Sequence, residues 1–135
     1  METHIYSFSY SRTGIPPDQW GHGGGFVFDC RLLPNPGREA KFASLTGRDE
    51  ETRKYLEARP LVGRFLRGVA GVVDLAQAEY LTRGYQHLSV AFGCTGGQHR
   101  SVYCAEWLRA HLERAGRRVT LEHLNVPPES SPAGV

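Results

Sequence analysis

The sequence of residues 88–101 is LSVAFGCTGGQHRS, and it joins an apolar run to a helical pattern through a glycine-rich turn. The run HLSVAFG, residues 87–93, is short and apolar, which predicts a buried strand. Residues 100–115 carry apolar side chains at helical spacing, so a helix follows immediately. Gly116 suits the end of that helix. The chain therefore passes directly from a strand into a helix.

The turn at Gly93–Ser101 is dense in groups that bind anions. The first turn of a helix leaves backbone N–H groups unpaired at the positive end of the helix dipole. Gly96 and Gly97 lack the Cβ atoms that would hold an anion away from the backbone. Two hydroxyls, a guanidinium and an imidazole add further donors, although a plain turn in which glycine serves packing is the alternative. The predicted phosphate-binding residues are Gly93, Cys94, Thr95, Gly96, Gly97, His99, Arg100 and Ser101.

Three known motifs can be tested on this turn. The Walker pattern GxxxxGK[ST] fails because no lysine stands at the required position, and the dinucleotide pattern GxGxxG fails as well. Cys94 and Arg100 are followed by Ser101 in the Cys-x5-Arg-[Ser/Thr] spacing of protein tyrosine phosphatases. A cysteine at a helix N-terminus beside cationic groups is expected to have a lowered pKa and to be nucleophilic. The alternative function is thus a phosphatase using Cys94 and Arg100, with Asp29 or Asp49 as general acid.

The N-terminal part of the chain contains two further apolar segments. Residues 3–10 predict a short strand, and the run FVFDCRLL, residues 26–33, predicts a buried one. Arg31 lies in that run, where a charge is costly unless it is paired. It is expected either to pair with Asp29 or to line the pocket. Asn35, between two prolines, is either a turn residue or a second pocket residue.

Helices and strands alternate along the remaining chain. Asp49 or a neighbouring residue is expected to cap a helix over residues 50–58, which Pro60 ends. A second helix is predicted over residues 61–83, and RRVTLEHL, residues 117–124, predicts a last strand. The expected inward face of the second helix consists of Leu61, Phe65, Val69, Val72, Val73 and Ala76.

This alternation predicts a single α/β domain, residues 1–124, with a mixed sheet flanked by helices. Residues 125–135 are poor in apolar side chains and are expected to form a disordered tail. No segment has the roughly 18 consecutive apolar residues of a membrane helix, and no secretory signal begins the sequence. Three cysteines are an odd number and form no CxxC pair, which favours a reducing cytoplasm and predicts no metal or other cofactor.

Arginine dominates the cations, because Lys+Arg is 16 and only Lys41 and Lys54 are lysines. The net charge of +2 is too small to indicate a nucleic-acid partner by itself. Arg109, Arg114, Arg117 and Arg118 gather at the end of the last helix. They either complement the helix dipole or contact RNA phosphates.

Four ordered segments resemble one protein family. GCTGGQHRSVYCAEWL (residues 93–108) resembles the signature of the C-terminal domain of the RNase adapter protein RapZ and its YvcJ-type relatives. Residues 7–17, 26–36 and 45–50, which are SFSYSRTGIPP, FVFDCRLLPNP and LTGRDE, resemble segments of the same domain. The resemblance runs in order from about Ser7 to His123, nearly the whole chain.

The resemblance implies a binding function rather than catalysis. In the family this domain is implicated in binding small RNA and in sensing the amino-sugar phosphate glucosamine-6-phosphate, with an anion pocket at the loop that corresponds to Cys94–Arg100. The domain also self-associates, so a homodimer is expected, and a regulatory protein is a further expected partner. The Walker loop of the family's nucleotide-binding domain is absent from the sequence, so nucleotide hydrolysis by that route is not expected.

Two positions depart from the family pattern. Some relatives have a pocket histidine directly after Leu-Pro-Asn-Pro, where this chain has Gly37. Relatives often carry His-Arg near the last strand, whereas His123 is followed by Leu124 here. His123 therefore remains an expected pocket-wall residue together with Arg31 and Asn35, and both departures bear on the amino-sugar ligand and the RNA surface.

Overall fold

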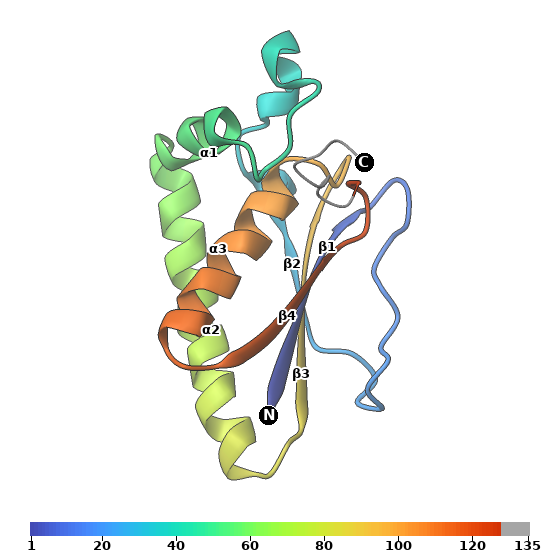
Figure 1. Ribbon diagram of the computed structural model, residues 1–135, viewed down its shortest axis with the longest axis vertical. Coiled ribbons are helices and arrows are strands. Elements are labelled where there is room, and N and C mark those ends of the chain that lie inside the picture. Colours follow the sequence, from blue (N-terminus) through green and yellow to red (C-terminus); the bar gives the residue numbers. More distant parts are fainter. Residues whose placement is uncertain (128–135) are drawn as a thin grey trace, which may run out of the picture.

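A computed structural model describes residues 1–127 of the chain (Figure 1). Its strands are β1 (Glu2–Ser9), β2 (Phe26–Asp29), β3 (His87–Cys94) and β4 (Arg118–His123). Its α-helices are α1 (Glu50–Glu57), α2 (Pro60–Thr82) and α3 (Arg100–Arg114). Short 3₁₀ turns occupy Cys30–Leu32, Pro36–Arg38 and Ala40–Phe42.

The four strands form one sheet in the order β2-β3-β1-β4, and every neighbouring pair is parallel. The prediction of a mixed sheet was therefore wrong, whereas the prediction of an α/β domain is confirmed. An antiparallel pair can be joined by a tight turn, but parallel neighbours need a long crossover. Each connection between these strands is such a crossover, so all strands point the same way.

The two faces of the sheet are covered differently (Figure 1). The helices lie on one face, and the segment Ser11–Gly25, here called the strap, crosses the other face between β1 and β2. The chain moves across the sheet in one direction from β2 to β3 and from β3 to β4, and in the opposite direction from β1 to β2. The connection from β1 to β2 lies on the opposite face from the other two. All three crossovers therefore have the same hand.

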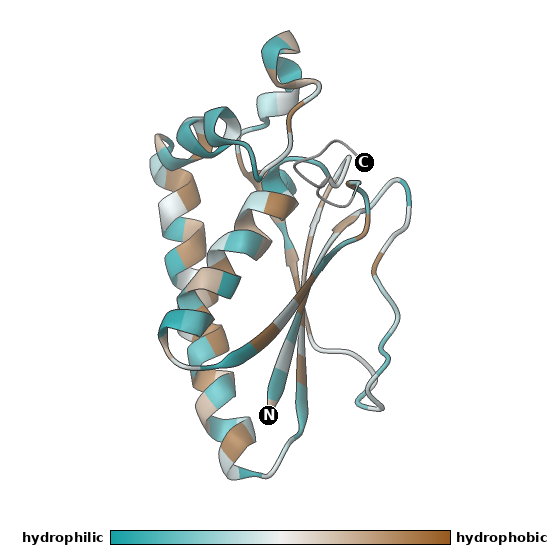
Figure 2. Ribbon diagram, in the orientation of Figure 1, coloured by the Kyte–Doolittle hydropathy of each residue, from teal (hydrophilic) through white to brown (hydrophobic). Residues whose placement is uncertain are grey.

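The core lies between the sheet and the helices. Ile5, Val90 and Phe92 face α2 and α3 and are completely buried, as are Val73 and Leu108. Figure 2 shows apolar colouring along the middle of the strands and alternating colouring along α2. Removal of these side chains from water is the main favourable contribution to folding.

The expected inward face of α2 is correct only in part. Val69, Val73 and Ala76 are buried as predicted, but Leu61 is 40% exposed and Val72 is 39% exposed. The buried side chains are Val62, Leu66, Val69, Ala70, Val73, Ala76 and Gln77. Apolar residues surround much of this helix, so spacing alone could not select the face that packs.

Several predicted boundaries also shift. The strand expected over residues 26–33 stops at Asp29, because the Asp29 carboxylate accepts from the Arg31 N–H at 2.9 Å and starts a 3₁₀ turn. Helix α3 ends at Arg114, and Gly116 takes a left-handed φ of 78° just beyond it, as predicted. The expected disorder of the tail falls, from residue 128 onward, outside the described residues.

The topology creates a crevice at one edge of the sheet. The carboxyl ends of all four parallel strands lie at the same edge (Figure 1). After β1 the chain leaves over the strap face, whereas after the neighbouring β3 it leaves over the helix face. Ligands of open α/β sheets bind outside the carboxyl ends of strands at such a switch point.

Candidate anion site at the carboxyl edge of the sheet

The glycine-rich turn lies at this switch point. It connects the end of β3 at Cys94 to the start of α3 at Arg100. Within residues 1–127, the backbone N–H groups from Thr95 to Val102 donate no hydrogen bond to any protein acceptor. These donors lie in the loop and in the first turn of α3, and no other part of residues 1–127 accepts a hydrogen bond from them.

One side of the turn is held by the side chains of Ser9 at the end of β1, Ser11 in the strap and Asn125 after β4. The hydroxyls of Ser9 and Ser11 both donate to the Thr95 carbonyl oxygen, at 2.5 and 2.7 Å. The Asn125 side-chain oxygen accepts from the Ser9 N–H at 2.7 Å. Gly97 has a φ of 70°, and a Cβ there would lie 2.8 Å from the Asn125 Cβ. Both the left-handed conformation and the close approach require glycine at this position.

The segment before α1 holds the other side. The Gln98 amide donates to the carbonyls of Ala43 and Leu45, at 2.8 and 2.6 Å. The His99 Nε2 lies 2.8 Å from the Phe42 carbonyl oxygen. Because a carbonyl only accepts, Nε2 carries a proton there, which leaves Nδ1 on the side of the ring that faces Gly37.

Gly47 brings this segment against the first turn of α3. Its N–H donates to the Gln98 carbonyl at 3.0 Å. A Cβ at Gly47 would collide with the His99 carbonyl oxygen and the Tyr103 N–H nitrogen. Only glycine permits such a contact between two backbones.

Arg100 points into the protein and is 6% exposed. Its Nη1 donates to the carbonyl oxygens of Arg31 and Leu33, both at 3.0 Å. The guanidinium therefore fixes the turn after β2 beside the start of α3. Arg100 also contributes to the walls of two hollows beside the loop.

The first hollow has a volume of about 210 Å³ and the second about 620 Å³. Asn35, Thr95 and Arg100 line both, so the two are adjacent. The smaller one is formed by the glycine-rich turn together with Gly37 and His99. The larger one adds Arg31, Arg38, Glu39 and Tyr55 among its lining residues. A small charged group in the first hollow could thus extend into the second.

The remaining expected pocket residues fall in different places. Asn35 caps its own turn by accepting from the Gly37 N–H at 2.9 Å, and it also lines both hollows. Arg31 pairs with Asp29 at 2.8 Å, which confirms the predicted ion pair. His123 lines neither hollow, because its ring bonds Ser7 on one side at 2.6 Å and Glu106 on the other at 2.8 Å.

The groups of a phosphatase are placed as follows. The Cys94 thiol is buried, 3% exposed, and its Sγ lies 3.1 Å from the Ser101 hydroxyl. The hydrogen bond from Arg31 holds the pKa of Asp29 below its ordinary value. A general acid must be protonated at the working pH, so this shift opposes that role for Asp29.

The arginines expected to contact RNA divide into two groups. Arg109 and Arg114 line a separate hollow of about 500 Å³ on the outer side of α3, together with Arg48 and Arg53. Tyr103 and Trp107 lie in the same wall. The other two expected residues, Arg117 and Arg118, are outside this wall, at the beginning of β4.

Sequence reasoning missed the residues that hold the loop. The missed residues are Ser9, Ser11, Gly47, Gln98 and Asn125. Four of them lie in the segments that carried the family resemblance or directly after them. That resemblance was the only signal able to find them, because no local pattern connects Ser9 with Thr95.

Known proteins are similar to this chain over nearly its whole length. A family model described as the RapZ C-terminal domain matches residues 1–127. A nucleotide-binding protein of Xylella fastidiosa (strain 9a5c) is 46% identical over 112 residues, which cover 82% of this chain and 36% of the relative. One of Dinoroseobacter shibae is 42% identical over 126 residues, 93% of this chain and 40% of the relative.

A third relative, the nucleotide-binding protein of Thermotoga petrophila, is 39% identical over 122 residues, which cover 90% of this chain and 41% of the relative. The chain thus spans about two fifths of the length of these relatives. Within residues 1–127 no helix is both long and apolar enough to cross a membrane. The match over residues 1–127 shows that the chain belongs to the RapZ C-terminal domain family.

Proposed function

We propose that the chain binds a phosphorylated small molecule without catalysis, and that it grips the phosphate at the Gly93–Ser101 loop. The supporting observation is the row of backbone N–H groups from Thr95 to Val102, which find no acceptor within residues 1–127. A phosphate has enough oxygens to accept from several of them at once. The positive end of the α3 dipole attracts the same charge.

The two adjacent hollows support a ligand larger than phosphate. The smaller hollow, about 210 Å³, suits the phosphate itself, and the larger one, about 620 Å³, suits a sugar or nucleoside attached to it. Arg38, Glu39 and Tyr55 line the larger hollow and offer a cation, a carboxylate and an aromatic ring. Such a mixed wall can hold a polar, partly apolar ring.

Calorimetric titration with inorganic phosphate, glucosamine-6-phosphate and a nucleoside monophosphate tests the proposal. Gly96→Asp places a negative charge on the loop, and a Cβ at Gly96 meets no atom within 4 Å. We expect Gly96→Asp to weaken binding by about tenfold or more, a loss of roughly 1.4 kcal/mol. Gly96→Ala is the steric control, and Gly68→Asp on α2 adds the same charge at a glycine where a Cβ also meets nothing. Silence of the folded protein toward all three ligands contradicts the proposal.

A second candidate is a cysteine-dependent phosphatase. Its support is the Cys94 Sγ beside the Ser101 hydroxyl at 3.1 Å in the Cys-x5-Arg-Ser spacing. It predicts turnover of p-nitrophenyl phosphate that disappears in Cys94→Ser. Absence of turnover above the buffer rate, from mildly acidic to neutral pH, removes this candidate while leaving phosphate binding intact.

A regulatory RNA-binding role is supported by the outer hollow of α3. Arg53, Arg109 and Arg114 gather there beside Tyr103 and Trp107. Glu57 and Glu106 line the same hollow, and Glu106 pairs with Arg109 at 2.5 Å. The cations and aromatic rings that remain suit single-stranded RNA. Affinity for such an RNA should fall steeply with salt, and Arg53→Ala should reduce the log–log slope by about 0.7. Arg83→Ala, at the end of α2, removes one charge elsewhere and should leave the slope unchanged.

A further inference from the structure

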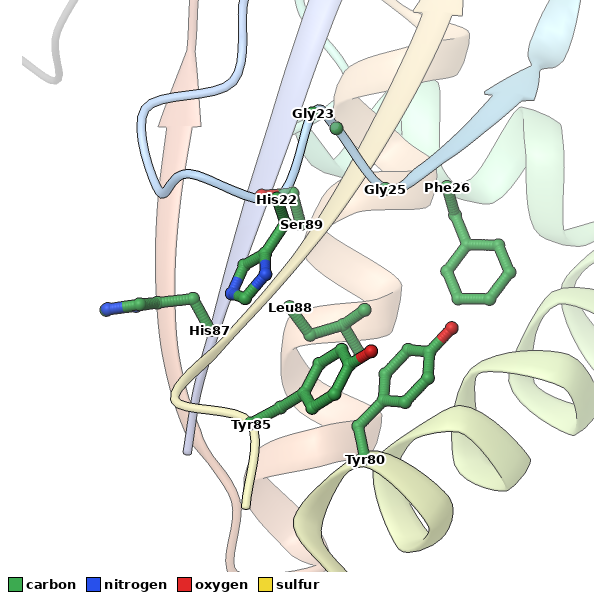
Figure 3. A pocket seen from close by; sticks show the side chains of 10 residues that line it. His22, Gly23, Gly25, Phe26, Tyr80, Tyr85, His87, Leu88 and Ser89 are labelled. Carbon is green, nitrogen blue, oxygen red and sulfur yellow. The ribbon is translucent and has the colours of Figure 1, made fainter. Parts of the chain in front are cut away.

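A second hollow of different chemistry lies at the opposite edge of the sheet (Figure 3). Its volume is about 410 Å³, and it lies between the end of α2, the start of β3 and the end of the strap. Its walls contain no lysine, arginine, aspartate or glutamate. Besides its two tyrosines, its only ionisable side chains are His22 and His87. An ionic ligand would lose hydration there without gaining a permanent counter-charge, so the occupant this hollow suits is neutral.

The end of α2 builds one wall from two tyrosines. The Tyr85 N–H donates to the Tyr80 carbonyl at 2.9 Å, and Gly84 takes a left-handed φ of 79° between them. This is the Schellman arrangement, in which the residues at its two ends come into contact. The two rings accordingly stack with centroids 4.6 Å apart, and the His22 ring stacks with Tyr85 at 5.3 Å.

The Schellman motif at the end of α2 accounts for the stacking of the two tyrosine rings, but it does not account for the position of their hydroxyls. Within residues 1–127 no protein group hydrogen-bonds the Tyr80 or Tyr85 hydroxyl, and Tyr85 is 38% exposed. Figure 3 shows both hydroxyls directed the same way, toward the side of the hollow where Gly25 and Phe26 lie. Two donors and acceptors are therefore available to a ligand at the same wall.

The sheet supplies a second pair of polar groups. The Glu2 N–H donates to the Gln86 carbonyl at 2.9 Å, so the backbone groups of Gln86 point toward β1. Backbone groups alternate along a strand, and those of His87 and Ser89 therefore point to the other side. A Cβ at Gly25 would collide with the Ser89 carbonyl oxygen, which agrees with this direction.

Strand β2 does not reach far enough to cover His87. Its first residue, Phe26, pairs with Val90. Before it the strap turns away at Gly23 and Gly24, with φ of 77° and 128°. The Asp18 carboxylate fixes this turn by accepting from the N–H groups of His22 and Gly23, at 2.8 and 3.0 Å. The N–H and C=O of His87 are thus left facing the hollow.

We propose that this hollow binds a neutral planar nitrogen heterocycle of the nucleobase type. A backbone N–H and C=O of one residue, pointing the same way, complement the neighbouring donor and acceptor on the edge of such a ring. Phe26 and the ring edges of the stacked Tyr80 and Tyr85 provide aromatic contacts for it. The site lies at the opposite end of β3 from the phosphate loop and is independent of it.

Titration of the ¹⁵N-labelled chain with adenosine, guanosine, cytidine and uridine, and with ribose as the ligand without a base, tests this proposal. At least one nucleoside should shift the His87 and Ser89 amide signals saturably, and ribose should not. Tyr85→Ala should weaken that binding by about tenfold, and Tyr80→Phe, which removes only a hydroxyl, by less. Leu81→Ala is the matched control, because Leu81 is 49% exposed on the same helix end and lines no part of the hollow.

The outcome separates the two proposed sites. Gly96→Asp should retain nucleoside binding while it loses phosphate binding. The proposal is overturned if no nucleoside shifts the His87 amide in the wild-type chain. It is equally overturned if nucleoside binding survives Tyr85→Ala and disappears in Gly96→Asp, because the base would then lie at the phosphate loop.

Discussion

The glycine-rich turn at Gly93–Ser101 and the strap face both concentrate histidine and hydroxyl groups, but they satisfy their polar atoms differently. On the strap face, the His4 ring nitrogens bond the Thr120 hydroxyl and the His87 ring at 2.8 and 2.9 Å. Trp20 stacks on His4 with a centroid distance of 3.9 Å, which closes this histidine cluster. At the glycine-rich turn, the Ser9 hydroxyl bonds the Thr95 carbonyl, whereas the backbone N–H groups of Thr95 to Val102 have no acceptor within residues 1–127.

This comparison teaches that density of polar residues does not identify a binding site. A cluster whose donors and acceptors satisfy one another is part of the architecture, since buried polar groups need partners. A site retains groups that the protein itself does not satisfy. The following predictions test that distinction, from the largest expected effect to the smallest.

Gly47→Ala should have the largest effect. The added Cβ would collide with backbone atoms of His99 and Tyr103, which cannot move independently of α3. We expect a loss of about 3 kcal/mol or more in the free energy of unfolding, together with loss of phosphate binding. Urea denaturation measures the first effect and calorimetry the second. Gly96→Ala is the control, and equal stability of both variants would contradict the close packing at Gly47.

Arg100→Lys should destabilise less but still measurably. A lysine cannot hold the carbonyls of both Arg31 and Leu33 with the geometry of a guanidinium. Loss of charged hydrogen bonds in a buried position should lower the free energy of unfolding by about 2 kcal/mol. Urea denaturation at neutral pH gives the value. An unchanged midpoint would mean that Arg100 is not a structural clamp for the turn after β2.

Acid should weaken the histidine cluster. Burial and the neighbouring His87 lower the pKa of His4 below the ordinary histidine value of 6.5, although Glu2 acts in the opposite direction. The unfolded chain therefore binds the proton more readily than the folded chain. The contribution of neutral His4 to stability is complete above pH 6.5 and is lost as the pH falls from there through the lowered pKa.

Unfolding free energies measured at neutral and mildly acidic pH test this sign. The decrease on acidification should be smaller in His4→Gln than in the wild type, because glutamine does not titrate. Fluorescence of Trp20, observed in a Trp107→Phe background, should report the same transition. A wild-type decrease no larger than that of His4→Gln would show that the cluster does not respond to pH.

Lys54→Ala should have the smallest effect. The ion pair of Lys54 with Glu50 on α1 spans 3.2 Å, and both side chains are largely exposed. An exposed pair of this spacing contributes about 0.3–0.5 kcal/mol, which salt screens further. Denaturation at low and high salt should give nearly equal stabilities. A loss above about 1 kcal/mol would show that exposed polar contacts matter more here than the comparison implies.

The turn from β3 into α3 was predictable because its information is local, whereas anion binding at this turn stays a prediction. Cys94 to Ser101 are consecutive, and the spacing of apolar residues predicts the strand before them and the helix after them. The direction of the strands was not predictable in this way, since an apolar run has the same pattern in parallel and antiparallel sheets. The inward face of α2 was likewise hidden, because Leu61 and Val72 are as apolar as the residues that pack.

The supports of the loop were hidden for a related reason. Ser9 bonds Thr95, and Asn125 bonds Ser9, although these residues are far apart in the sequence. Only the sheet order, in which β1 lies between β3 and β4, brings them together. Short-range sequence patterns do not indicate the order of the strands in the sheet.

The central place of β1 also has a consequence for how the chain folds. Glu2 pairs with His87 on one side and Arg118 on the other, so β1 has no partner in the sheet until the chain has been made beyond residue 87. Pairings of such long separation are slow to form because of the entropy of closing the intervening loop. During synthesis β1 is consequently an unprotected strand that chaperones or neighbouring chains can reach.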